Sequence, residues 1–391
     1  MKQSTPTTTV PTTARALKTG APKKTSKQAA STPPPLAASS ATSITVGLDL
    51  GDRHSHFCVL DPVGVPREQG KVAMFAKDLT AFFQRVAPAR LVLEVGGQSP
   101  WVSRLAQTAG LEVIVANPRR VQLITRNERK NDRTGAELLA RLGRVDPKLL
   151  SPVQHRSAQC QADLAVNRAR DVAVASRTAL INHVRGAIKS YGQRLPTCSA
   201  DSFHKRVLTH LPVELVPALT PTVQLIGQVS DQIQSFDAQI ERLAEERYPA
   251  TKLLRQVSGV GPVTALCFVL TLDNPARVSH SRQVGPFLGL VPRTHDSGAS
   301  TPQLRITKAG DPALRRLLVI AANYILGPFG PDCDLRRFGQ ELAAQGGKNG
   351  RKRAKVAVAR KLAVLLHHLW KTGEVYDPLY LAKKRGEVVP A

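Results

Sequence analysis

The sequence has 391 residues, of which 42% are hydrophobic, so it is long and apolar enough for two or three domains with hydrophobic cores. Its formal net charge of +26 favours a polyanionic partner, nucleic acid ahead of an anionic membrane surface. No run of 18 apolar residues is present, so no membrane-spanning helix is expected. The five cysteines are scattered without a CxxC pair, which argues against a zinc ribbon or a disulfide scaffold and is typical of the reducing cytoplasm.

Residues 1–42 are rich in Thr, Ser, Pro, Ala and Lys and contain no Asp or Glu. Such a composition cannot bury enough apolar surface to fold, so it predicts a disordered basic tail.

Residues 43–150 predict a mixed α/β domain. A hairpin is expected within 45–61, where alternating apolar residues flank a Gly-Asp-Arg break. The remaining pattern predicts a strand at 70–75, a helix at 78–86, a strand at 90–94, a helix at 101–109, a strand at 111–115 and a helix at 132–142. The order is three strands, helix, strand, helix, strand, helix, which matches the ribonuclease H-like fold.

Three acids occupy distinctive places in this pattern. Asp49 lies in the first strand, Glu94 ends the fourth, and Asp132 begins the last helix. A carboxylate in a buried strand costs free energy unless it is paired or binds a metal, although Asp49 could instead cap the adjacent turn. If the three acids converge at one sheet edge, two Mg²⁺ ions held there could clamp the attacking and leaving oxygens of a phosphodiester.

Residues 151–248 predict two long helices, 160–191 and 222–247, because apolar residues recur every three or four positions. Leu-Pro pairs at 195–196 and 211–212 mark loops between them. The pattern favours a coiled-coil arm that dimerises the protein over an ordinary helical bundle.

Residues 249–391 predict a mainly helical domain with three candidate nucleic-acid contacts. The Gly259-Val260-Gly261 segment is similar to a helix-hairpin-helix turn, whose backbone amides bind a DNA phosphate, although a plain turn fits equally well. Ser297 lies in a polar loop, where it could attack a phosphate whose charge nearby cations neutralise, or simply contact a phosphate or cap a helix. A basic run at 346–361 opens an amphipathic helix. The residues expected to contact nucleic acid are Gly259, Gly261, Arg293, Arg305, Lys308, Arg315, Lys348, Arg351, Lys352 and Arg353.

Taken together, these blocks resemble the DEDD transposases of bacterial insertion sequences, the insertion-sequence one-ten family. The resemblance is carried by the Asp49 strand, Leu93-Glu94-Val95-Gly96, Lys130-Asn131-Asp132 and the 289–316 block. It implies a RuvC-like N-terminal domain of the ribonuclease H type at 43–150, a coiled-coil region at 151–248 and a C-terminal transposase domain at 249–391.

The resemblance also implies Mg²⁺-dependent recombination of double-stranded DNA guided by a structured RNA, in a homo-oligomer, a dimer or tetramer formed through the helical region. The serine matching Ser297 would be the nucleophile, and Asp49, Glu94 and Asp132 would be catalytic acids that hold the metal.

One position departs from the family pattern. A fourth acid is expected three residues after Asp132, on the same helix face, but that residue is Gly135. Glu137 is five residues on and poorly aimed to replace it. Two alternatives therefore stay open: a catalytically impaired relative that only binds nucleic acid, and a RuvC-like structure-specific nuclease that does not need Ser297.

Overall fold

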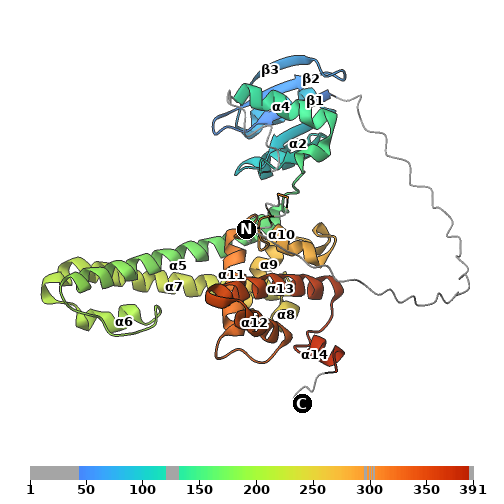
Figure 1. Cartoon of the computed structure of the whole chain (residues 1–391). Coiled ribbons are helices and arrows are strands. Elements are labelled where there is room, and N and C mark those ends of the chain that lie inside the picture. The colour runs from blue at the N-terminus through green and yellow to red at the C-terminus, as the bar shows by residue number, and fades with distance from the viewer. Residues whose placement is uncertain are drawn as a thin grey trace, which may run out of the picture. The chain divides into compact units, whose positions relative to one another are not determined.

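The computed structural model describes residues 44–119, 132–294, 297–298, 300, 302 and 304–386, apart from the side chain of Lys348. The predicted basic tail and the Lys130-Asn131 pair lie outside the described residues. The chain forms two compact units, Met1–Pro152 and Val153–Ala391 (Figure 1). The further domain boundary expected at residue 248 stays a prediction.

The first unit is built on a five-stranded mixed sheet. Its strands are β1 (Ile44–Asp49), β2 (His54–Leu60), β3 (Pro66–Ala73), β4 (Ala89–Glu94) and β5 (Glu112–Ala116). They lie in the order β3-β2-β1-β4-β5, with β1 antiparallel to β2 and parallel to β4. The β2–β3 pair is antiparallel and the β4–β5 pair is parallel. β3 begins four residues before the predicted strand because its first residues are polar and lie on the exposed sheet edge, so no apolar pattern marks them.

Helices cover both faces of this sheet. They are α1 (Ala76–Val86), α2 (Ser99–Thr108), α4 (Asp132–Val145) and the short η1 (Pro147–Leu150). Val46 and Leu48 of β1 join a core with α1 and α2, whereas Cys58 and Leu60 of β2 pack with α4. The mixed α/β prediction is confirmed, and the described elements follow the predicted order of three strands, helix, strand, helix, strand and helix.

Gly47 allows α4 to lie very close to the central strand. A Cβ at this position would come within 1.9 Å of the carbonyl oxygen of Ala136 and 2.6 Å of the amide of Ala140. Only a residue without a side chain fits there. The contact brings the start of α4 to the end of β1, where Asp49 lies.

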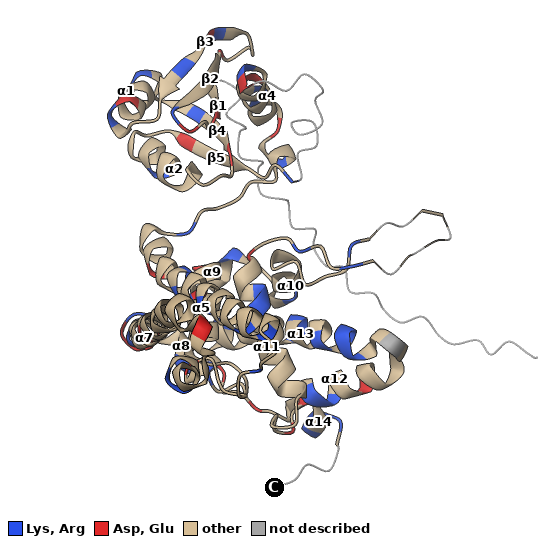
Figure 2. Cartoon of the chain, turned by 90° about the vertical axis from the view of Figure 1, so that its left-hand side faces the viewer, with Lys and Arg blue, Asp and Glu red and all other residues tan. Residues whose placement is uncertain are grey.

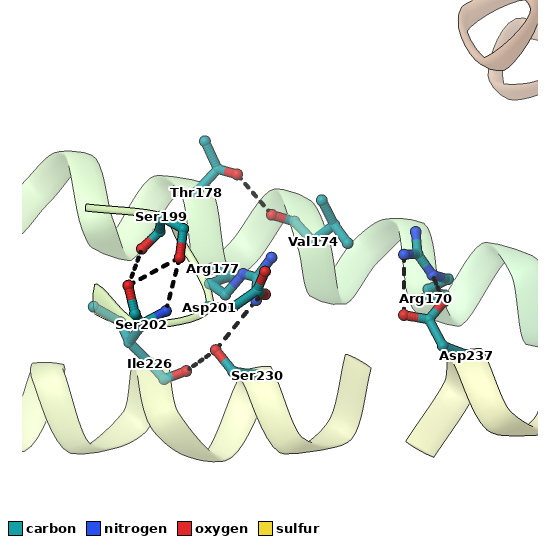
Figure 3. Close-up of polar contacts among 10 residues, drawn as sticks. All are labelled: Arg170, Val174, Arg177, Thr178, Ser199, Asp201, Ser202, Ile226, Ser230 and Asp237. Carbon is teal, nitrogen blue, oxygen red and sulfur yellow. Dashed lines mark hydrogen bonds and ion pairs between the residues drawn. The ribbon is translucent and has the colours of Figure 1, made fainter. Parts of the chain in front are cut away.

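The second unit carries an arm of two long antiparallel helices, α5 (Ala158–Ser190) and α7 (Val216–Glu246). Polar pairs join them at matching levels (Figure 3). Arg170 pairs with Asp237, with Nη2 3.2 Å from Oδ2, and Arg177 Nη1 lies 3.3 Å from the Ser230 hydroxyl. The two levels are seven residues apart on both helices, which is the repeat of coiled-coil packing.

The tip of the arm is a separate small core. It contains α6 (Phe203–Val207), η2 (Leu208–His210) and η3 (Val213–Leu215). Phe203 and Val207 pack there against Val184 and Ile188 of α5 and Ile226 of α7. The predicted pair of long helices with a loop-rich tip is thus present, although α7 begins six residues earlier than predicted and includes Pro221.

The rest of this unit is helical. Its elements are α8 (Ala250–Leu254), α9 (Pro262–Leu272), η4 (Pro275–Arg277), η5 (Ser281–Gln283), α10 (Val284–Phe287), α11 (Pro312–Leu326), α12 (Asp334–Gln345), η6 (Gly347–Asn349), α13 (Gly350–Thr372) and α14 (Tyr380–Lys384). α9 is the buried centre, and Leu164 and Ile240 at the base of the arm share its core with Leu314 and Leu362. No helix in the described part of the chain is long and apolar enough to cross a membrane.

His367 is a polar residue inside this core. Its Nδ1 lies 2.9 Å from the hydroxyl of Ser281, and its Nε2 lies 2.9 Å from the carbonyl oxygen of Pro275. The ring is fully buried, and burial lowers its pKa below the usual value for histidine. His367 therefore fastens the 275–281 segment to α13 in its neutral form.

Candidate functional site

Two of the predicted acids, Asp49 and Glu94, lie at the same end of the sheet. Asp49 is the last residue of β1 and pairs with His56 across the hairpin. Leu48 lies opposite Leu93 in the parallel β1–β4 pair, so Asp49 and Glu94 follow at the same end of both strands. Oε1 of Glu94 is shielded from solvent. The topology therefore brings these two carboxylates to one sheet edge.

The first turn of α4 lies against the same edge. Oδ2 of Asp132 lies 3.5 Å from Nδ1 of His56. A Cβ at Gly135 would lie 2.4 Å from Oδ2 of Asp49, so the position three residues after Asp132 faces Asp49 directly. Glu137 turns away and accepts hydrogen bonds from Gln69 and Arg141. The carboxylate expected at residue 135 would have joined Asp49, and Glu137 does not take its place.

His56 was not among the residues predicted for this site. The register of the predicted hairpin could have identified His56, because the residue paired with Asp49 on the neighbouring strand lies next to Asp49.

The acids do not form a ready-made metal site. Among the residues that the structure describes, no group of three or more His, Cys, Asp or Glu side chains lies close enough to hold a metal ion. The assignment of Asp49, Glu94 and Asp132 as metal ligands stays a prediction.

Ser297 lies on an exposed tight turn. Its amide donates to the carbonyl of Ser300 at 3.2 Å, and the amide of Ser300 donates back at 3.1 Å. Gly298 has a φ of +54°, the left-handed conformation that a two-residue hairpin turn favours. Both bonds join backbone groups, so they do not use the serine hydroxyls.

Two antiparallel segments form the stem of the loop that carries this turn. Pro292 pairs with Ile306, and the amide of Arg293 donates to the carbonyl of Arg305 at 2.9 Å. Arg293 and Arg305 are therefore directly opposite, and both are exposed. Like charges opposite each other destabilise a β-pair, so this arrangement favours an anion between them. We call residues 288–311 the serine loop.

The base of the serine loop is closed by Arg315 and by two left-handed glycines. The Arg315 guanidinium donates to the carbonyls of Leu288 at 2.9 Å and Ala309 at 2.8 Å. Gly289 and Gly310 have φ of +67° and +69°, and a Cβ on either would strike backbone atoms across the base. Arg315 therefore holds both ends of the serine loop together, and its predicted contact with nucleic acid stays a prediction. The backbone of Lys308 takes part in the same closure, because its amide donates to the carbonyl of Gly289 at 3.1 Å.

The glycine pair at 259–261 connects α8 to α9. Gly259 has a φ of +84° and lies against Tyr324 of α11, and Gly261 caps the N-terminus of α9 with open space around it. The segment joins two helices as a helix-hairpin-helix turn would. Its binding to phosphate stays a prediction.

The first turn of α13 carries three exposed cations, Arg351, Lys352 and Arg353, which we call the α13 cations (Figure 2). The first turn contains no acid. Positive charges are unfavourable at a helix N-terminus, where the helix dipole is also positive. Their placement is therefore better explained by an anionic partner than by helix stability.

Comparison with known proteins places these features in a family. Residues 46–193 match the DEDD-type IS110 model described as transposase, and residues 251–331 match the model described as transposase IS116/IS110/IS902 family. The chain is 28% identical to a probable family 20 transposase of Pseudomonas aeruginosa over 85% of this chain and 98% of that protein. It is 29% identical to the transposase for insertion sequence element IS1111A of Coxiella burnetii, over 85% and 90%, and 27% identical to that of IS1328 of Yersinia enterocolitica, over 72% and 83%.

These matches define a transposase, an enzyme that recombines DNA. The two family models together cover more than half of the sequence. The chain belongs to the IS110 family of DEDD transposases of insertion sequences. Transposases of the DEDD type generally use a divalent metal ion.

Proposed function

We propose that this transposase is an RNA-guided serine recombinase of double-stranded DNA, with Ser297 as its nucleophile. The observation that supports this most is the presentation of Ser297 on an exposed turn, above a stem with two opposed arginines. Guanidinium groups neutralise phosphate charge and so help a hydroxyl to approach the phosphorus.

The proposed step is a transesterification. A bond forms between Ser297 Oγ and phosphorus as the bond from phosphorus to a deoxyribose oxygen breaks. The serine proton passes to solvent or a nearby base, and the leaving oxygen ends as a hydroxyl. One phosphodiester replaces another, so no energy source is needed, and a second deoxyribose hydroxyl can reverse the step on another strand.

The first unit is proposed to be RuvC-like, of the ribonuclease H class. The β3-β2-β1-β4-β5 order, with acids ending β1 and β4, supports this proposal. Mg²⁺ is the proposed ion and Asp49, Glu94 and Asp132 its proposed carboxylates. The described acids do not form a group of three ligands, and the proposed transesterification is written without the ion.

A structured guide RNA and double-stranded DNA are the proposed partners. The net charge of +26, the α13 cations and the opposed stem arginines support binding to phosphates. Assembly into a dimer or tetramer through the α5–α7 arm is proposed with them.

Ser297→Ala tests the nucleophile, and Ser300→Ala is its matched control. Both serines lie in the same turn, and its bonds are backbone bonds that alanine keeps. On denaturing gels, the protein–DNA adduct should vanish in Ser297→Ala and persist in Ser300→Ala, with DNA binding intact in both. Adducts that persist in Ser297→Ala and vanish in Ser300→Ala would assign the nucleophile to Ser300.

The alternative of a catalytically impaired relative is favoured by one observation. Gly135 occupies the position that faces Asp49, so the sheet edge has one carboxylate fewer than the family pattern. That alternative predicts tight nucleic-acid binding and no adduct from the wild-type protein. If the protein were a RuvC-like nuclease, its Ser297→Ala variant would still cut DNA.

A further inference from the structure

An ion pair fastens the end of the serine loop to the helical arm. Asp311, which ends the loop, forms an ion pair with Arg168 of α5. The side chain of Asp311 is only 11% exposed, and that of Arg168 is 34% exposed, so the carboxylate is the shielded partner of the pair. α5 thus contacts the loop through a charged pair at the point where the loop becomes α11.

Asp311 also determines how α11 begins. Its Oδ1 accepts hydrogen bonds from the amides of Ala313 at 3.0 Å and Leu314 at 2.9 Å, which makes it the N-cap of α11. One turn later, Arg315 bonds the carbonyls of Leu288 and Ala309. A displacement of Asp311 therefore moves the start of α11, and with it the residue that closes the base of the loop.

A second ion pair supports the same junction. Asp171, one turn along α5 from Arg168, lies 2.8 Å from Nη2 of Arg316 and 3.9 Å from Nη1 of Arg168. The two helices are thus joined by alternating charges, with Arg168 between two carboxylates. The planar guanidinium can serve both at once, which a lysine ammonium on a flexible stem does less well.

We propose that Arg168 is a positioning residue for strand cleavage: it fixes Asp311 to α5 and so sets the serine loop, and Ser297 with it, relative to the arm. The inference rests on the proposed function for the role of Ser297, but the mechanical coupling does not. The arm, which is proposed to mediate assembly, would thereby determine the position of the loop that carries the nucleophile.

Arg170 supplies a matched control. It lies two residues away on the same helix and also pairs with an aspartate, but its partner is Asp237 of α7 rather than the loop (Figure 3). Arg168→Ala and Arg170→Ala each remove one arginine–aspartate pair from α5. Only the first removes a contact with the serine loop.

The first measurement is hydrogen exchange in the free, full-length protein. The stem amides of Arg293, Thr307 and Lys308 should exchange faster in Arg168→Ala and at the wild-type rate in Arg170→Ala. The exchange rate in Arg168→Lys should lie between those of the wild type and Arg168→Ala. This variant keeps the positive charge and can be measured even if the alanine variant fails to fold. Unchanged stem exchange in both Arg168 variants, or equal acceleration in Arg170→Ala, would overturn the coupling.

The second measurement is the single-turnover rate of adduct formation at saturating DNA. A misplaced nucleophile typically costs up to about 100-fold, so Arg168→Ala should slow adduct formation by about 10–100-fold while DNA affinity is unchanged. A rate equal to that of Arg170→Ala would overturn the positioning role. If the wild-type protein forms no adduct, the proposed nucleophile fails, and the exchange measurement still decides whether Arg168 holds the loop.

Discussion

Gly135→Asp restores the carboxylate that the family pattern expects, and the structure gives the size of its effect. A Cβ at this position would lie 2.4 Å from Oδ2 of Asp49, so the Asp49 side chain must rotate in any substituted variant. In Gly135→Ala this costs about 1 kcal/mol for an off-rotamer side chain, against a gain of about 1 kcal/mol in helix propensity. Gly135→Asp adds a second charge, and carboxylates about 4 Å apart repel by about 1–4 kcal/mol, from bulk water to a protein surface.

In the presence of a chelator, the full-length Gly135→Asp variant should therefore unfold at a lower temperature than the Gly135→Ala variant. Each kcal/mol corresponds to about 2–4 °C in the unfolding midpoint for a unit of this size. Mg²⁺ held between the two carboxylates would remove the repulsion, so adding Mg²⁺ should close the gap between the Asp and Ala variants.

The control for this experiment is KCl at the same ionic strength, because salt alone screens repulsion between exposed charges. If Mg²⁺ and KCl narrow the gap equally, residue 135 does not face a metal site and the reasoning is wrong. A lower Mg²⁺ requirement for recombination in the Asp variant than in the wild type would be the functional counterpart.

Three further results are expected. Gly47→Ala should lower the free energy of unfolding by at least about 1–3 kcal/mol through overpacking against α4, whereas Gly96→Ala, with no atom within 4 Å of the new Cβ, should not; equal denaturation midpoints would refute the close contact. Alanine at all three α13 cations should reduce the slope of log K against log salt by about 2–3 in binding titrations, and an unchanged slope would show that they do not contact phosphates. The thermal midpoint should fall as pH drops below about 6.5, because burial lowers the pKa of His367 and the unfolded chain then binds more protons than the folded one; His367→Asn should flatten this dependence, and an equal pH dependence in both proteins would contradict it.

Much of the fold was accessible from the sequence because apolar periodicity reports burial directly. The α1 prediction from Leu79, Phe82 and Phe83 succeeded since these side chains fill the core beneath the sheet. The family resemblance was accessible because its blocks, such as Leu93-Glu94-Val95-Gly96, are short runs that can be recognised without the fold. By contrast, the start of β3 was missed because an exposed edge strand needs no apolar side chains.

The site was accessible only in part. The sequence placed Asp49 inside the first strand and Glu94 at the end of the fourth, whereas Asp49 is the last residue of β1. It could not show that Gly135 lies against Asp49, because that depends on the Gly47 contact that sets the depth of α4. In the sequence, Arg315 was one more cation near Ser297. In the structure, its guanidinium donates hydrogen bonds to two backbone carbonyls. The partner of Arg168 was equally hidden, since 143 residues separate it from Asp311. Such long-range polar contacts leave no periodic trace.

The seven-residue spacing of the polar levels in the arm has a practical consequence for its length. The Arg170–Asp237 and Arg177–Ser230 levels are related by one heptad on α5 and one on α7. Removing one heptad from each helix at matched positions would shorten the arm by about 10 Å and preserve which faces meet. Removing a heptad from one helix alone would leave the tip without matched partners. The arm is thus a spacer whose reach can be changed in whole heptads, and variants of graded length would measure how far apart the elements at its two ends must be for recombination.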